Sequence, residues 1–259
     1  MLQFTRRSTA GAPDDAVAEA SADVAAVIAV VEALADAPTT TEAISRALAL
    51  VRERFGWAYA SYWRIDPADR ALHFVQESGD AGAEFRQVTL AASFREGVGL
   101  AGRAWRSRDL VFVPDLGQLA DCVRATAAQR VGVRSGICFP LYEDGEVTGT
   151  MDFFATETLT PSPQRLDALR AIGKLVSQAI ERVTASARQA KAAEDTRAVS
   201  ELLRAITSAT TRQEAMSRAL DTIRHGFDWA YGSYWAIDDS DRALHFVTQS
   251  GTAGQAFRE

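Results

Sequence analysis

Apolar residues recur every three or four positions between Asp14 and Ala35, and Pro38 follows the last of them. This spacing predicts an amphipathic helix that ends before the proline. A second helix is expected from about Thr40, with Thr39 or Thr40 as its N-cap. The chain is therefore expected to open with two consecutive helices.

The pattern changes to strands after the second helix. Residues Trp57 to Ile65 are rich in aromatic residues, and the turn residues Asp66 to Asp69 separate them from the run Ala71 to Gln76. This arrangement predicts a β-hairpin. A second hairpin is predicted from Ser135 to Tyr142 and Glu146 to Ala155, because the Asp-Gly pair between them favours a tight turn.

Weaker patterns fill the space between the two hairpins. We expect a short helix at Glu84 to Ala92, a helical turn at Ala101 to Ser107, a strand at Leu110 to Val113 and a weakly amphipathic helix at Asp115 to Arg130. A long helix begins at Pro161 or Pro163. These elements describe an α+β domain with one largely antiparallel sheet and a long C-terminal linker helix.

The long helix carries a heptad stripe. Such a stripe is typical of a coiled-coil dimer or signalling helix, but it also suits a helix that packs against its own domain, and amphipathicity does not separate the two. Its apolar positions include Leu166, Leu169, Val176, Ile180 and Val183.

The chain contains an internal repeat with an offset of 172 residues. Phe55 to Gln87 and Phe227 to Glu259 are identical at 22 of 33 positions. This repeat predicts a duplicated domain rather than a solenoid, whose units are much shorter. The second copy lacks a counterpart of Val88 to Val183, so we expect the chain to be part of a longer protein. The predicted domains are an N-terminal, partly helical extension (1–26), a complete domain (27–183), a helical linker (184–198) and a truncated second domain (199–259).

Composition excludes several classes of function. The chain is 47% hydrophobic and 24% charged, which is typical of a soluble globular protein. Its net charge of -6, without a basic run, argues against nucleic-acid binding. The longest apolar run, Val24 to Val31, is too short to span a membrane. Two cysteines among 259 residues indicate a reducing compartment, so we expect a cytoplasmic location.

No catalytic motif is present, and we do not expect an enzyme. Cys122 and Cys138 lie sixteen residues apart, which excludes a CxxC redox pair, and they supply too few ligands for a closed zinc site. His73 and its repeat partner His245 are expected to be ordinary strand histidines rather than metal or haem ligands, because no second ligand lies at useful spacing. The sequence identifies neither a metal nor a cofactor.

Five stretches of the first copy form a recognisable set in chain order: FGWAYASYWRID, GVGLAGRAW, LVFVPDL, GVRSGICFPLYEDGEVTGTMDFF and the helix SPQRLDALRAIGKLVSQAIERV. With these stretches the first copy resembles the GAF domain, a relative of the PAS fold that serves as a small-molecule or chromophore sensor in bacterial signalling proteins. The tandem arrangement and the segment MDFFATETLT are similar to the sensor half of actinobacterial methyl-accepting chemotaxis proteins.

This resemblance implies a six-stranded antiparallel sheet. The terminal helices are expected on one face and a ligand pocket on the other, under a roof formed by Val88 to Arg130. It also implies a homodimer through the terminal helices and a downstream signalling domain outside this chain. The ligand stays unidentified, because the motif of cyclic-nucleotide-binding relatives and the cysteine-histidine pair of chromophore-binding relatives are missing.

Asp152 is the most informative pocket candidate. A carboxylate between Met151 and Phe153 in a strand must be paired, protonated or solvated. Arg103, Arg124 or Arg134 could supply its partner. The function expected is a sensory module that relays ligand binding through its C-terminal helix; a ligand-free dimerisation spacer and a cysteine-based redox enzyme or sensor are the alternatives. The candidate ligand-binding residues are Trp63, Phe112, Cys122, Arg124, Cys138, Asp152 and Phe154.

Overall fold

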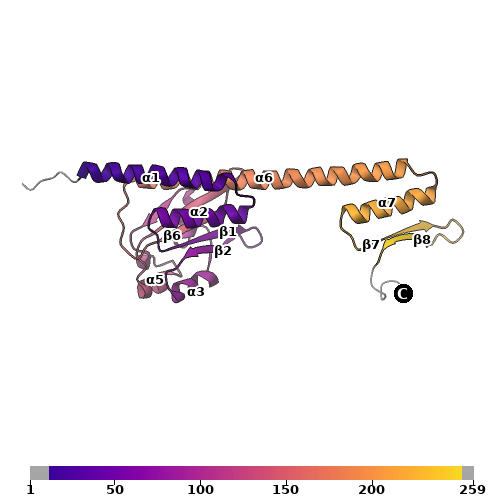
Figure 1. Cartoon of the computed structure of the whole chain (residues 1–259). Helices are drawn as coiled ribbons and strands as arrows, with labels where there is room; N and C mark the ends of the chain where they lie inside the picture. Colours follow the sequence, from indigo (N-terminus) through magenta and orange to yellow (C-terminus); the bar gives the residue numbers. More distant parts are fainter. Residues whose placement is uncertain (1–11, 253–259) are drawn as a thin grey trace, which may run out of the picture. The chain divides into compact units, whose positions relative to one another are not determined.

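Six strands in the first part of the chain form one antiparallel sheet in the order β3-β2-β1-β6-β5-β4 (Figure 1). The computed structural model describes residues 12–252, which fall into two units divided between Thr184 and Ala185. Residues 1–11 of the predicted N-terminal extension and residues 253–259 of the second copy lie outside the described residues. The strands are β1 Tyr59–Asp66, β2 Ala71–Gly79, β3 Ser93–Phe94, β4 Val111–Val113, β5 Gly136–Glu143 and β6 Glu146–Phe154.

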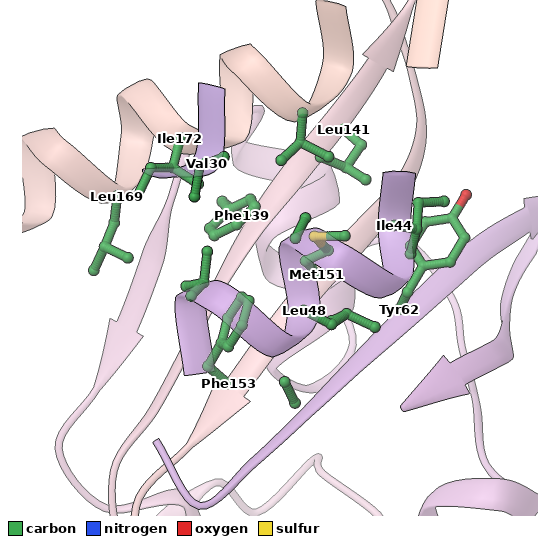
Figure 2. Packing of buried hydrophobic residues seen from close by; sticks show 14 of the residues in the cluster. Val30, Ile44, Leu48, Tyr62, Phe139, Leu141, Met151, Phe153, Leu169 and Ile172 are labelled. Atoms are coloured by element: carbon green, nitrogen blue, oxygen red, sulfur yellow. The ribbon is translucent and has the colours of Figure 1, made fainter. Parts of the chain in front are cut away.

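Three helices cover one face of this sheet: α1 Ala12–Ala35, α2 Thr40–Arg54 and the first part of α6 Pro163–Thr207. Their apolar stripes meet the aromatic and aliphatic side chains of β5 and β6 in a buried layer, which we call the helix-side core. Thr39 caps α2 as predicted, since its hydroxyl accepts a hydrogen bond from the Glu42 amide at 3.2 Å. Figure 2 shows the members Val30, Ile44, Leu48, Tyr62, Phe139, Leu141, Met151, Phe153, Leu169 and Ile172.

Shorter elements cover the opposite face and form a roof over it. They are α3 Ala83–Ala91, α4 Gly99–Ser107, the 3-10 turn η1 Leu116–Gln118 and α5 Ala125–Val131. The helix predicted from Asp115 to Arg130 was therefore too long. The Asp115 carboxylate accepts from the Gly117 amide at 3.0 Å and turns the chain early, so that a helix resumes only at Ala125. The buried layer beneath the roof is the roof-side core.

The predicted Asp-Gly turn joins β5 to β6. Asp144 and Gly145 both have positive φ, 52° and 78°, as a type I′ turn requires. Together with the antiparallel register, this turn confirms the expected fold of helices around a six-stranded antiparallel sheet.

The second unit repeats the opening of the first. After α6, which is one continuous helix of 45 residues, come α7 Arg212–Gly226, β7 Tyr231–Ile237 and β8 Leu244–Gly251. The register shift between Tyr62 and Trp63 in the first hairpin recurs between Tyr234 and Trp235 in the second. Within residues 12–252, no helix combines the length and the apolar character needed to cross a membrane.

Candidate functional site

The site is built on the roof-facing side of three neighbouring strands. In the register of the sheet, Asp152 of β6 lies opposite Ser61 of β1 and opposite Cys138 of β5. Successive side chains of a strand point to opposite faces. Asp152 and Phe154 therefore face the roof, while Met151 and Phe153 enter the helix-side core.

Ser61, Trp63 and Arg124 surround the Asp152 carboxylate as hydrogen-bond donors. The Ser61 hydroxyl donates to Oδ1, and the Arg124 guanidinium donates from Nη2 to Oδ2 at 2.6 Å. The Trp63 indole Nε1 lies 3.0 Å from the Ser61 hydroxyl and 3.1 Å from Asp152 Oδ2. All four residues are fully buried, so the carboxylate is paired, the first of the three states that the sequence left open.

The Arg124 side chain enters this layer from the roof, where it precedes α5. Its guanidinium carbon lies 4.7 Å from the ring centre of Phe154, 4.9 Å from Phe94, 5.1 Å from Trp63 and 5.9 Å from Phe85. We call these four rings the aromatic cage. Cation–π attraction stabilises a guanidinium at such distances. Arg124 Nε and Nη1 are buried without a hydrogen-bond partner.

Burial and the neighbouring polar groups act in opposite directions on the Arg124 guanidinium. Burial is the largest influence and acts to lower the pKa, but the Asp152 charge, the hydrogen bond to Asp152 and the nearby Cys122 and Cys138 together outweigh it, so the pKa lies above its ordinary value. Burial and the nearby Asp152 charge raise the pKa of the Cys138 thiol well above 9.0. Cys138 is therefore a protonated thiol with the character of a small hydrophobic residue.

The sequence that forms this sheet and roof matches a known family. The GAF domain profile matches residues 37–181, which is more than half of the chain. The chain belongs to the GAF domain family. GAF domains are typical of sensory and regulatory modules in signalling proteins. No curated protein sequence is significantly similar to this chain.

Solved structures with the GAF fold resemble the first unit. A free methionine-R-sulfoxide reductase from Neisseria meningitidis, in complex with its substrate, is 18% identical with a TM-score of 0.55, and the match covers 72% of this chain and 98% of the reductase. The GAF domain of a phosphoenolpyruvate-protein phosphotransferase from Coxiella burnetii is 14% identical with a TM-score of 0.54, covering 65% and 98%. At these identities the likeness establishes the fold alone.

The structure brings six of the seven predicted ligand-binding residues into the roof-side core: Trp63, Cys122, Arg124, Cys138, Asp152 and Phe154. Among the three arginines considered as partners of Asp152, Arg124 takes that role. The seventh residue, Phe112, lies on the wrong face. Phe112 pairs with Ile137 in the sheet and packs against the helix-side core, so it does not face the roof with the other candidates.

Trp57 lies on the other face of the sheet from Tyr59 and Trp63. The strand predicted from Trp57 begins only at Tyr59, and the Trp57 ring belongs to the helix-side core. Strand alternation does not extend through the irregular residue before the strand.

The heptad stripe of α6 lies mainly inside its own domain. Leu169, Val176, Ile180 and Val183 are buried, and Leu166 packs at the edge of the helix-side core. The sequence left open whether this stripe forms a coiled coil or packs against its own domain. These side chains pack against their own domain.

Sequence reasoning missed three members of the site. Ser61 lies within the predicted first strand, but the sequence does not identify its hydroxyl as a donor to Asp152. Phe85 and Phe94 come from the roof, and nothing in their local pattern shows that they close around Arg124. The available sequence signal was Asp152 itself, because a carboxylate among apolar strand residues requires a partner and surrounding side chains that bury the pair.

A second group of polar residues lies at the turn between β1 and β2. Asp66, Asp69 and His73 bring one ligand atom each to within 4.8 Å of one another, which the spacing argument against a histidine ligand did not foresee. His73 Nε2 lies 2.8 Å from Asp69 Oδ2, and both side chains are about half exposed. The His73–Asp69 pairing explains why these three residues lie together, and we interpret them as part of an ordinary surface turn.

Proposed function

We propose that residues 27–183 form a cytoplasmic sensory module that binds a small molecule in place of the Arg124 side chain and relays the exchange to α6. The observation that carries this proposal is the buried Arg124–Asp152 pair, which occupies the side of the sheet where the resemblance implies a ligand pocket. A charged pair in this position costs desolvation that an apolar pair would not. A role in binding would account for this cost.

The alternation of side chains along β6 supports the proposed relay. Asp152 faces the site, while its neighbours Met151 and Phe153 pack with α6 in the helix-side core. A change in the position of the Asp152 backbone therefore moves side chains that α6 contacts.

Two hydrogen bonds tie the same hairpin to α6. Ser177 accepts from the Tyr142 amide at 3.0 Å, and Glu181 accepts from the Asp144 amide at 3.0 Å. A packed layer with such ties transmits a shift as a discrete repacking rather than absorbing it.

The proposal includes the second copy. Residues 199–259 would form the first part of a second GAF domain, joined by the helical linker 184–198, in a signalling protein of the chemotaxis-sensor type with a downstream signalling domain. Equivalent hydrogen bonds support this assignment. Arg52 donates to Ser78 at 3.1 Å, and Arg224 donates to Ser250 at 2.8 Å at the same positions of the repeat.

Native mass spectrometry of the full chain purified from cells tests ligand binding. We expect a co-purifying small molecule that is lost in Ser61→Ala, which removes one donor to Asp152. The molecule should be retained in Arg130→Ala, which changes an exposed arginine of α5. A chain that carries no small molecule in any cell extract would contradict the proposal.

The outer face of α1 supports a second candidate function, a dimerisation spacer. Val17, Val24, Ile28 and Val31 are exposed and recur at intervals of seven, four and three residues, as in a coiled coil. Beside this stripe lies an apolar groove of about 320 Å³ between α1 and α6. We propose that a second copy of the chain covers this surface and forms a homodimer.

Light scattering of the full chain tests the homodimer. The double variant Val24→Asp/Ile28→Asp should be monomeric at concentrations where the unmodified chain is a dimer. Ala25→Asp, on a neighbouring exposed face of α1, should leave the dimer intact. A monomeric unmodified chain would exclude this interface.

We propose no catalytic role for the two cysteines. Both are free and buried, and the high pKa of the Cys138 thiol leaves little thiolate for redox chemistry.

A further inference from the structure

Arg124 is held in the way that a protein holds a cationic ligand. One carboxylate oxygen of Asp152 accepts from its guanidinium, and the aromatic cage surrounds the rest of that group. A carboxylate combined with several ring faces is the general solution for binding guanidinium and ammonium groups. The cage therefore has the chemistry of a cation site, filled by a side chain of the protein itself.

We propose that the small molecule bound by this domain is an organic cation with a guanidinium or ammonium group, and that Arg124 is a built-in occupant that this cation displaces. The inference rests on the proposed function. It adds the chemical class of the ligand and states that the ligand competes with the Arg124 side chain for Asp152 and the aromatic cage.

Charge balance decides between ligand classes. Asp152 is fully buried, and an isolated buried carboxylate is strongly unfavourable. A neutral ligand that displaced Arg124 would leave Asp152 without a counter-charge. A cation restores the balance at the same place.

An anionic ligand would require Arg124 to stay and to use its free donors, Nε and Nη1. These donors lie within the aromatic cage, whose ring faces carry negative electrostatic potential. An anion placed beside them would meet those faces and the nearby Asp152 charge. The surroundings of the free donors thus favour a cation over an anion.

Arg124 has a route out that leaves the sheet intact. Val123, the preceding residue, is 59% exposed, so the segment reaches the surface at this point, while Cys122 and Ala125 on either side of the pair Val123–Arg124 are buried. The roof bonds near it are peripheral: Asp121 accepts from the Gly99 amide and from Arg103, each at 3.0 Å. Outward movement of the segment would extract the Arg124 side chain without breaking a strand pairing.

The test uses the full chain and three probes of matched size: n-propylguanidine, its neutral isostere n-propylurea, and the anion butyrate. In Arg124→Ala the cage is vacated, and n-propylguanidine should raise the melting temperature, whereas propylurea and butyrate should not. The affinity for n-propylguanidine should exceed that of the unmodified chain by about tenfold or more, because the internal competitor is gone. Arg130→Ala should behave like the unmodified chain.

A variant with a weaker occupant covers the case in which Arg124→Ala does not fold. Arg124→Lys keeps a cation in the cage but lacks the planar guanidinium, so n-propylguanidine should again bind more tightly than to the unmodified chain. Equal stabilisation by propylurea, tighter binding of butyrate, or no stabilisation of either variant by n-propylguanidine would each overturn the cationic class.

Failure of the inference and failure of the proposed function give different results. If the mass-spectrometry experiment finds a co-purified neutral or anionic molecule, the sensory proposal stands and the cationic class falls. If it finds no ligand and n-propylguanidine stabilises neither variant, both fall.

Discussion

Arg124 and Asp152 are joined at 2.6 Å, with neither side chain exposed to solvent. The ion pair between Arg130 and Glu84 at 2.7 Å, by contrast, lies largely in solvent. Exposed pairs contribute little to stability, whereas removal of one partner from a buried pair leaves an uncompensated charge. The energetic effect of the site on the fold is therefore concentrated in this single pair.

Asp152→Asn should lower the free energy of unfolding by about 3 to 5 kcal/mol, because Arg124 would remain buried without a counter-charge. Urea denaturation followed by circular dichroism measures this loss. Glu84→Gln removes the partner of an exposed arginine and should cost less than about 1 kcal/mol. Equal losses for the two variants would contradict the assigned role of the pair.

Gly173→Ala should destabilise the domain although alanine favours helices. A Cβ at Gly173 would lie 2.9 Å from Cδ2 of Phe139, whose ring stacks on Phe153. We expect a net loss of about 1 to 3 kcal/mol from overpacking, against a helix-propensity gain of about 1 kcal/mol or less. Thermal unfolding checks the sign, and Lys174→Ala at the exposed neighbouring position serves as the control. An increase in stability would show that α6 does not rest closely on β5.

The thiols of Cys122 and Cys138 should resist alkylation in the native chain. Both are buried, and the raised pKa of Cys138 keeps its thiol protonated at pH values where ordinary cysteines begin to ionise. Mass spectrometry after iodoacetamide treatment should find both unmodified in buffer and both modified in urea. Rapid native labelling of Cys138 would revive the redox alternative.

The roof should loosen in acid through Asp121. Burial acts to raise the pKa of this carboxyl, but the Gly99 amide and Arg103 outweigh it and hold the pKa below its ordinary value of 3.8. Since the folded-state pKa is the lower one, the stabilisation is fully present above the unfolded value and is lost as pH falls through the folded one.

Asp121→Asn tests this dependence. The difference in unfolding free energy between the unmodified chain and this variant should be constant near neutral pH and shrink below about pH 4. A difference that is independent of pH throughout this range would exclude the Asp121 charge as a roof tether.

Much of the fold followed from local pattern. The first helices, both hairpins and the Asp-Gly turn were predicted because periodicity and turn chemistry are local properties. The segment between Asp115 and Arg130 was not, since its path depends on capping by Asp115 and on the burial of Arg124. Neither effect produces a periodic signal in the sequence.

The candidate site was predictable where strand alternation applied. Asp152 was identified because a carboxylate among apolar strand residues needs a partner, and Arg124 was one of three partners considered. Phe112 was misplaced because a strand of three residues gives too little pattern to fix its parity. The rings of Phe85 and Phe94 could not be foreseen, because tertiary packing alone brings them to Arg124.

The hairpin of the second unit contains the same hydrogen bond between tryptophan and serine as the first hairpin. Trp235 donates to the Ser233 hydroxyl at 3.0 Å, the same length as the bond from Trp63 to Ser61, although the residues from 212 to 251 hold no counterpart of β6. The hairpin alone therefore orients the indole and the hydroxyl, without a carboxylate such as that of Asp152. A designer could transplant this bulged hairpin as a ready-made receptor for a carboxylate on an incoming strand.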